Sequence, residues 1–378
     1  MNLLLVAMVV MICYAMAGVM VATLDLGSLL GEHAFAVALF AVILFVFAYT
    51  LFGGTFAHAY TNTVQGGIMV VVALLLVSSG AEYWGDGFFA KLAAIDPALA
   101  APVNPGSLLF RNIFEVFVAN FAVGLALAVQ PHFVIKSLYV KSDRDVNVYL
   151  AIAIVCGVLF NLVMLCGLYA RLGPSAEIEA FARASGLGID GIMPAYVVQT
   201  FSPAVGAIVS IALLAAGMST LDGILVAISA IFANDIVLAL RRRDASTTER
   251  DLQLGFRAGR WSLIALGCVS FVLGMMQHAS KEFSIAIFAQ EGIYALFAAT
   301  FAPVLLGMFA KSPPPARVAL LSSVTALLVH FGMRYGKLSL VTGADWTNPG
   351  LTATFALAAS VAVVGVWYAF HRESKIVK

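Results

Sequence analysis

Long apolar runs without charge dominate the chain. The first run extends from Met1 to Leu24, and the first charged side chain after it is Asp25. A second run, from His33 to Ala81, contains no Asp, Glu, Lys or Arg. An α-helix rises 1.5 Å per residue, so about 20 apolar residues cross the hydrocarbon core of a bilayer. The second run therefore predicts two spanning helices.

The same pattern continues along the sequence and predicts an all-α integral membrane protein. Ten spans are expected near residues 2–24, 34–53, 61–80, 110–134, 147–170, 201–227, 261–277, 284–310, 317–333 and 351–370. The sixth is expected to continue through Asn234 and Asp235 toward the basic cluster at 241–243. Backbone polar groups must be paired inside lipid, and the alternating pattern of a membrane β-barrel is absent, so helices are the remaining choice.

Composition supports this interpretation and excludes a soluble enzyme. Hydrophobic residues make up 62% of the chain and charged residues 11%, whereas soluble domains carry about 25% charged residues. The four cysteines, Cys13, Cys156, Cys166 and Cys268, all fall inside predicted spans. They are interpreted as small apolar residues of the core, neither disulfide partners nor metal ligands. The N-terminus lacks the basic segment of a signal peptide.

Basic residues separate the loops into two sets and predict the orientation. One set holds Lys136, Lys141, Arg144, Arg241, Arg242, Arg243, Arg250, Arg257, Arg260, Lys311, Arg317, Arg372, Lys375 and Lys378. The other holds Lys91, Arg111, Arg171, Arg183, Lys281, Arg334 and Lys337. The positive-inside rule places the first set, and both termini, in the cytoplasm. The longest outside loops are expected at 81–109 and 171–200.

The sixth predicted span contains the first group of polar residues that suggests chemistry. Ala216, Ser219 and Thr220 stand at positions i, i+3 and i+4 and therefore share one helical face. Hydroxyl and carbonyl oxygens on such a face are ligands that a hard cation prefers. Close helix packing, with hydroxyls bonded to their own i−4 carbonyls, is the alternative, and spacing alone favours it. Asp222 shifts the balance toward function, because an intramembrane carboxylate costs about 3 kcal/mol.

Gln130-Pro131-His132, late in the fourth predicted span and preceded by Gly124, forms a second group. Pro131 removes a backbone donor and disrupts the helix. Broken helices of this kind line the substrate sites of transporters, while a simple proline kink is an equally good explanation. His132 is interpreted as an interfacial or structural histidine.

The third group is Gln290-Glu291, with Tyr294 one turn later, in the eighth predicted span. A binding or gating role and a structural hydrogen bond both remain open for Glu291. Glu115 has Arg111 as its i−4 neighbour, and the two are expected to form a surface pair. The sequence shows no phosphate-binding loop, nucleophile elbow or metal-ligand spacing, so no catalytic residues are expected.

Three stretches together resemble the sodium:solute symporter family, which includes sodium/proline, sodium/pantothenate and sodium/glucose symporters. The stretches are 215–220 followed by Asn234-Asp235-Ile236, Gly53-Gly54 followed by Tyr60-Thr61-Asn62-Thr63-Val64-Gln65, and Gln130-Pro131-His132 with Lys136. The resemblance extends over essentially the whole chain. The run Lys91–Pro97 is most similar to the pantothenate branch.

The resemblance implies a LeuT-type inverted-repeat bundle in one transmembrane transporter domain, 1–378. Family members usually have thirteen spans, and this sequence matches the last ten. Residues 1–80 then correspond to part of the first repeat, 110–310 to the second repeat and 311–378 to two C-terminal helices. A first helix that begins Met-Asn-Leu-Leu-Leu without flanking charge favours a further segment upstream, so the first repeat is expected to be incomplete.

The resemblance also implies a sodium site that uses the Ala216 carbonyl and the Ser219 and Thr220 hydroxyls, and whose remaining ligands are backbone carbonyls of a family span that this sequence lacks. No other metal or cofactor is expected. Asn62 stands where the family has an acidic residue, which argues against a second sodium site there. Gln65 belongs to the same family motif. Val123 and Leu127 replace aromatic residues that often face substrate.

The leading hypothesis is sodium-coupled symport of a small organic solute across the cytoplasmic (inner) membrane by alternating access. Gly124, Gln130, Pro131, Gln290, Glu291 and Tyr294 are the substrate or gating candidates. The solute is expected to be a carboxylate, such as an amino acid or a pantothenate-like acid. The alternatives are a truncated or split transporter that is inactive alone, with a separate chain supplying N-terminal helices, or a membrane sensor of symporter-like fold.

Overall fold

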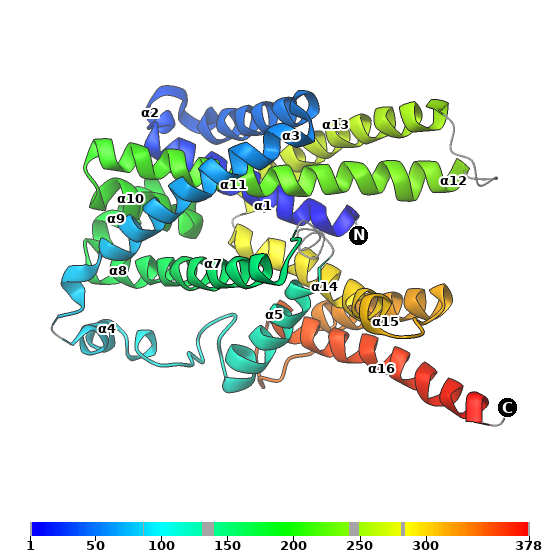
Figure 1. The fold of residues 1–378 in the computed structure, drawn as a ribbon. Coiled ribbons are helices and arrows are strands. Elements are labelled where there is room, and N and C mark those ends of the chain that lie inside the picture. The colour runs from blue at the N-terminus through cyan, green and yellow to red at the C-terminus, as the bar shows by residue number, and fades with distance from the viewer. Residues whose placement is uncertain (1, 86, 131–139, 242–248, 281–283, 377–378) are drawn as a thin grey trace.

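The computed structural model describes residues 2–85, 87–130, 140–241, 249–280 and 284–376 (Figure 1). Regular structure within these residues is helical throughout. The long helices are α1 Asn2–Thr23, α3 Ala34–Ser78, α7 Asp143–Leu162, α11 Pro203–Ile231, α13 Glu249–Ser280, α14 Ile285–Phe309, α15 Ala316–Tyr335 and α16 Pro349–Ile376. The shorter helices are α2 Leu26–Leu30, α4 Phe88–Ile95, α5 Asn120–Ala128, α8 Cys166–Leu172, α9 Ser175–Ala184, α10 Ile192–Thr200 and α12 Ala239–Arg241.

By length and composition, nine helical segments of the described chain can cross a membrane. They correspond to nine of the ten predicted spans. The tenth, expected near 110–134, is a shorter apolar helix, Phe114–Ala128, that begins with the π-helical turn Phe114–Ala119. The residues that follow Gln130 in this prediction lie outside the described part of the chain.

Helix α3 contains two of the spans. Its backbone is helical from Ala34 to Ser78, and the segments long enough to cross are Leu26–Leu51, which includes α2, and Asn62–Tyr83. Figure 1 shows that the helix bends sharply between them. Its second half therefore runs back along the molecule, opposite in direction to the first half. Gly53 and Gly54 lie in the connecting stretch, and glycines are a frequent cause of helix kinks.

Two helices are longer than hydropathy alone indicates. α11 continues through the π-helical segment Phe232–Leu238 into α12, which confirms the predicted extension of the sixth span. α13 begins at Glu249, well before the predicted residue 261, because its first turns are amphipathic and project beyond the apolar stretch. The predicted outside loops also contain α4, α9 and α10.

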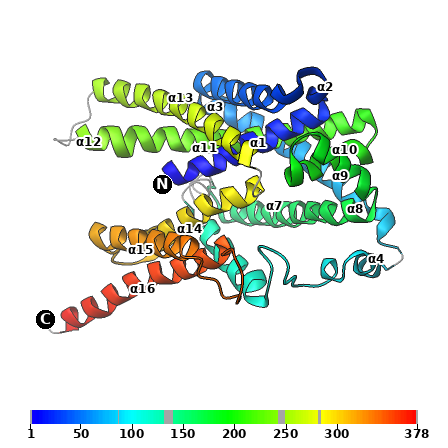
Figure 2. The same cartoon turned by 180° about the vertical axis from the view of Figure 1, so that it is seen from behind.

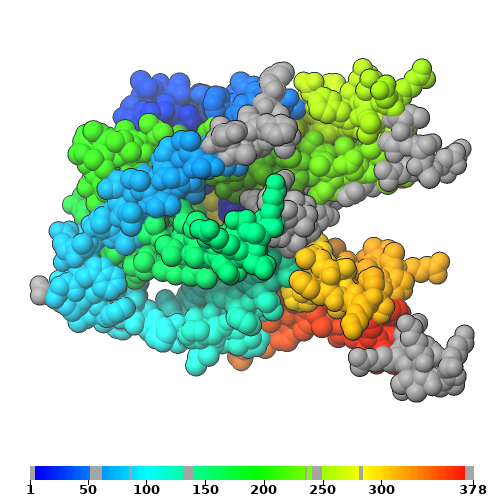
Figure 3. Space-filling view, viewed as in Figure 1, coloured from blue at the N-terminus to red at the C-terminus, as the bar shows by residue number. Residues whose placement is uncertain are grey.

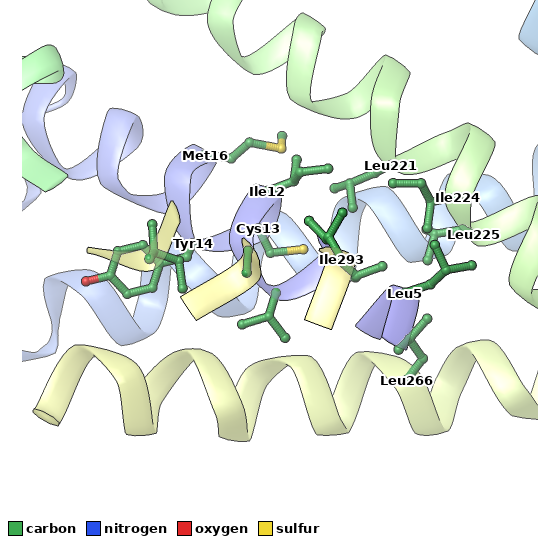
Figure 4. Packing of buried hydrophobic residues seen from close by; sticks show 14 of the residues in the cluster. Leu5, Ile12, Cys13, Tyr14, Met16, Leu221, Ile224, Leu225, Leu266 and Ile293 are labelled. Carbon is green, nitrogen blue, oxygen red and sulfur yellow. The ribbon is translucent and has the colours of Figure 1, made fainter. Parts of the chain in front are cut away.

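Helix α1 lies at the centre of the packing and contacts α3, α11, α13 and α14. Figure 4 shows apolar side chains of α1, including Leu5 and Ile12, meeting Leu221 of α11, Leu266 of α13 and Ile293 of α14. Seen from both sides, α14, α15 and α16 form a group at the C-terminal end (Figures 1 and 2).

Helix α7 stands apart from this core. No residue in its most apolar stretch is buried, and Figure 3 shows open space between α7 and the segment that follows α4. The molecule is therefore a packed group of helices around α1 with one loosely attached span beside it.

Candidate functional site

The turn Ala216–Thr220 lies in α11, a helix that packs against α1 and α3. Gly217 faces α1 so closely that a Cβ atom there would lie 2.6 Å from Cγ and Sδ of Met16. Residues two apart on a helix point to different sides, so this contact turns Ser219 away from α1. Ala216 and Ser219 are half-buried and Thr220 is exposed. Ser219 therefore points away from α1, whereas Thr220, three residues after Gly217, neighbours the Gly217 contact on the helix surface.

Ser219 and Thr220 have different partners. The Ser219 hydroxyl donates a hydrogen bond to Oδ1 of Asn62, in the second half of α3, over 3.0 Å. The Thr220 hydroxyl donates to the carbonyl of Ala216, over 3.1 Å. The second bond is the i−4 bond that the packing explanation predicts, whereas the first connects two helices. The structure therefore contains the intrahelical bond expected for close helix packing and, at Ser219, a side-chain oxygen contact that a cation face could use.

An unsatisfied acceptor lies one turn from Asn62. Gln65 follows at i+3 on α3, and its Oε1 atom is buried with no hydrogen-bond partner. A buried acceptor without a donor is costly, and an ion or water at the site would relieve that cost. The Ala216 carbonyl and the Ser219 and Thr220 hydroxyls, with the Asn62 amide bonded to Ser219, are oxygen groups of the kind that a hard cation prefers. These residues therefore fit sodium.

Asp222 is buried beside this face, with 2% of the residue exposed. Its Oδ1 atom accepts a hydrogen bond from the Tyr49 hydroxyl, and Thr50 Oγ1 lies 3.3 Å from the same oxygen. The Thr50 hydroxyl is also 2.8 Å from the Val46 carbonyl. The carboxylate that the sequence places inside the membrane is therefore held by hydroxyls from the first half of α3.

The second predicted group is described only in part. Gln130 is buried, donates to the Ala126 carbonyl over 2.8 Å and accepts from the Thr300 hydroxyl of α14 over 3.0 Å. A Cβ atom on Gly124, in α5, would meet nothing within 4 Å. Pro131 and His132 lie outside the described residues. The structure thus connects the end of α5 to α14.

The residues of the third predicted group, Gln290, Glu291 and Tyr294, lie in two different environments. Gln290 and Tyr294 of α14 line a cavity of about 30 Å³ together with Glu115, Asn120 and Asn348. A cavity of this size holds about one water molecule. Its wall includes the π-helical turn before α5, and such turns are frequent at functional sites.

Glu291 points elsewhere and forms an ion pair with Arg334 of α15. The Glu291 Oε1 atom lies 2.5 Å from Arg334 Nη2 and accepts a hydrogen bond from Nε over 2.8 Å. The Arg334 guanidinium also lies over the Trp346 ring, 4.6 Å from its centroid. Of the two roles left open for Glu291, the structure shows the structural bond, and the gating role stays a prediction.

The expectation of a surface pair between Arg111 and Glu115 is wrong. Arg111 is 8% exposed and Glu115 1% exposed, and their Nη2 and Oε1 atoms are 2.6 Å apart. Arg111 Nη1 also donates to the carbonyl of Trp346, over 3.0 Å. The segment before α16 covers the pair, and its position 235 residues away in the sequence explains why local spacing does not reveal it.

Sequence reasoning missed Tyr49, Thr50, Arg334 and Asn348 as partners of the predicted site residues. Tyr49 and Thr50 end an apolar run, a common place for interfacial residues, so nothing in the sequence connects them to Asp222. Arg334 carried a weak signal, because a buried glutamate in a membrane helix needs a cation and α15 offers one in its last turn.

Comparisons with known proteins identify relatives of this chain. The model described as "Sodium:solute symporter family" matches residues 2–324. The sodium/pantothenate symporter of Haemophilus influenzae is 27% identical over 220 residues, which cover 56% of this chain and 42% of that protein. The high-affinity proline transporter PutP of Bacillus subtilis is 27% identical over 318 residues, which cover 81% and 58%. A sodium/proline symporter of Staphylococcus aureus is 25% identical, covering 85% and 59%.

A solved structure of a Na⁺-coupled sialic acid symporter, in a substrate-bound outward-open state, superposes with a TM-score of 0.59 at 16% identity. The match covers 96% of this chain and 73% of that chain and bears out the predicted LeuT-type helical fold. The chain spans 42–59% of the length of these curated relatives. Since the family model matches most of its residues, this multi-pass membrane chain belongs to the sodium:solute symporter family.

Proposed function

We propose that this chain carries out sodium-coupled symport of a small organic solute by alternating access across the cytoplasmic membrane. The observation that carries the proposal is the contact between the two oxygen-bearing faces: Ser219 of α11 bonds to Asn62 of α3, beside Thr220 and the Ala216 carbonyl. In a member of a sodium symporter family, oxygen ligands on adjoining helices suit the coupling ion.

Sodium would be held by the Ala216 carbonyl and by the hydroxyls of Ser219 and Thr220. When bound, the ion supplies the coupling energy, about 2.3 kcal/mol per charge for each 100 mV of membrane potential. The chain's own contribution is geometric. Gly217 fixes the rotation of α11 against Met16, and Asn62 orients the Ser219 hydroxyl so that its lone pairs remain available.

The solute face is proposed to lie between α5 and α14. Gly124 leaves open space beside α5, and Gln130 connects the end of α5 to Thr300. Gln290 and Tyr294 add polar groups on the same helix as Thr300. The solutes named for the relatives, proline, pantothenate and sialic acid, all carry a carboxylate. A small carboxylate is therefore the proposed class of solute for this chain.

The proposed orientation places both ends of the chain in the cytoplasm, as the distribution of lysine and arginine indicates. The loop between α14 and α15 then faces the cytoplasm, and the loop between α15 and α16 faces outward. A separate chain that supplies further helices stays a prediction.

Uptake into proteoliposomes tests the proposed function. The purified chain is reconstituted, and uptake of radiolabelled proline and pantothenate is measured under an inward sodium gradient and under an equal potassium gradient. We expect sodium-dependent uptake that is lost in Ser219→Ala. The matched control is Ser262→Ala in α13, where the hydroxyl bonds only within its own helix, to the Gly259 carbonyl over 2.7 Å.

Sodium-dependent uptake that survives Ser219→Ala would contradict the assigned ion site. Absence of uptake by the unsubstituted chain for every solute tested would favour the alternative of a transporter part that is inactive alone.

A further inference from the structure

Asp222 is the single charged residue of α11. It stands three residues after Ser219, so the two Cα atoms differ by about 4.5 Å along the helix axis. Residues at i and i+3 are neighbours on a helix surface, and Asp222 therefore adjoins the face proposed for sodium. With 2% of the residue exposed, its carboxylate lies inside the protein.

The ligands proposed for the ion are all neutral. Ala216 offers a backbone carbonyl, and Ser219 and Thr220 offer hydroxyls; Asn62, which bonds to Ser219, is a neutral amide. A cation that binds at this half-buried site loses part of its hydration, and neutral oxygens replace only some of what is lost. A negative charge close to the site reduces that cost, and such an interaction is stronger inside a protein than in water.

Two hydroxyl groups of α3 lie at the Asp222 carboxylate. The Tyr49 hydroxyl donates to Oδ1, and the Thr50 hydroxyl lies within hydrogen-bond distance of the same atom. Both hydroxyls come from the first half of α3, while Asn62, which binds Ser219, lies in the second half. Both halves of α3 therefore contact this part of α11.

We infer that Asp222 supplies the compensating charge for the cation held at Ala216, Ser219 and Thr220, without being one of its ligands. The inference rests on the proposed function and adds to it a residue that strengthens cation binding. One carboxylate balances the charge of one monovalent ion.

The test is the sodium dependence of thermal stability, since an ion that binds the folded chain at concentration c stabilises it by RT ln(1 + c/Kd). The full chain, purified in detergent, is melted over a sodium series with choline chloride keeping the ionic strength constant, and the Kd fitted to the series is the sodium midpoint. We expect Asp222→Asn to raise this midpoint by at least about tenfold. Asp222→Glu keeps the charge and is expected to stay within about threefold of the unsubstituted chain.

The control is Asp190→Asn. Asp190 also accepts two hydrogen bonds, from the Ser284 hydroxyl over 2.6 Å and from the Ile285 N–H over 3.0 Å, but it lies in the turn Gly188–Gly191 and contacts the start of α14. Its replacement is expected to leave the sodium dependence unchanged.

Tyr49→Phe separates charge from structure. It removes a donor to Asp222 and keeps the carboxylate, so its sodium midpoint should fall between those of the unsubstituted chain and Asp222→Asn.

If Asp222→Asn or Asp222→Glu fails to fold, Tyr49→Phe becomes the deciding variant, and an unchanged midpoint in that variant overturns the inference. An unchanged midpoint in a folded Asp222→Asn does the same and leaves the proposed function intact. A sodium-independent melting temperature in the unsubstituted chain overturns both.

Discussion

Ser219 and Asn62, 157 residues apart in the sequence, are joined by a hydrogen bond of 3.0 Å from the serine hydroxyl to the asparagine Oδ1 atom. The bond connects α11 to the second half of α3 at the level of the proposed sodium ligands. Replacing Asn62 is therefore expected to change the ion site although no residue of α11 is substituted.

Replacement of Asn62 by alanine tests this connection. A neutral hydrogen bond contributes about 1 kcal/mol, so we expect Asn62→Ala to weaken sodium binding about fivefold, as measured by the sodium-dependent melting temperature. Asn161→Ala is the control, because the Asn161 amide donates to its own helix, at the Gly157 carbonyl over 2.8 Å. Equal effects of the two substitutions would argue against a special role for Asn62.

Gly217 sets the rotation of α11 and is expected to tolerate no side chain. A methyl group there would lie 2.6 Å from Met16, which is itself buried with 5% exposed. We expect Gly217→Ala to lower the free energy of unfolding by about 1–3 kcal/mol and to weaken sodium binding as α11 shifts. Gly223→Ala, on the same helix, has nothing within 4 Å and should be neutral or stabilising. A neutral Gly217→Ala would show that α11 is not fixed at this point.

The buried pair Arg111–Glu115 is expected to matter for stability. Glu115→Ala leaves the Arg111 charge buried without its carboxylate, which costs about 3–5 kcal/mol. Glu179→Ala is the matched control, since the Arg171–Glu179 pair has side chains 52% and 38% exposed and exposed pairs contribute less than about 1 kcal/mol. Chemical denaturation of the purified chain measures both. Similar losses in the two variants would contradict the buried pair.

The orientation can be tested by labelling single cysteines. In a chain whose four native cysteines are replaced by serine, Lys311→Cys lies between α14 and α15, and Leu340→Cys lies between α15 and α16. Both positions are exposed. We expect a membrane-impermeant maleimide to label residue 340 in intact cells and residue 311 only after permeabilisation. The opposite pattern would reverse the proposed topology.

The sequence predicts the membrane spans well because hydropathy depends on local composition. Nine of the ten expected spans have a counterpart of sufficient length. The face of Ala216, Ser219 and Thr220 was also predictable, since helical periodicity alone brings these residues together.

Contacts between distant segments were not predictable. Tyr49 reaches Asp222 across 173 residues, and Arg334 reaches Glu291 across 43. The predicted surface pair of Arg111 and Glu115 is buried because the segment around Trp346 covers it. Each of these contacts depends on how whole helices pack, and no local spacing carries that information.

Sodium binding to the purified chain tests the central claim most directly. Equilibrium binding of radioactive sodium is measured on the full chain, on Ser219→Ala/Thr220→Ala and on Ser262→Ala. The account predicts saturable binding that potassium does not displace, that the double substitution abolishes and that Ser262→Ala retains. Saturable binding that persists in the double variant, or an unsubstituted chain that binds no sodium, would contradict the account.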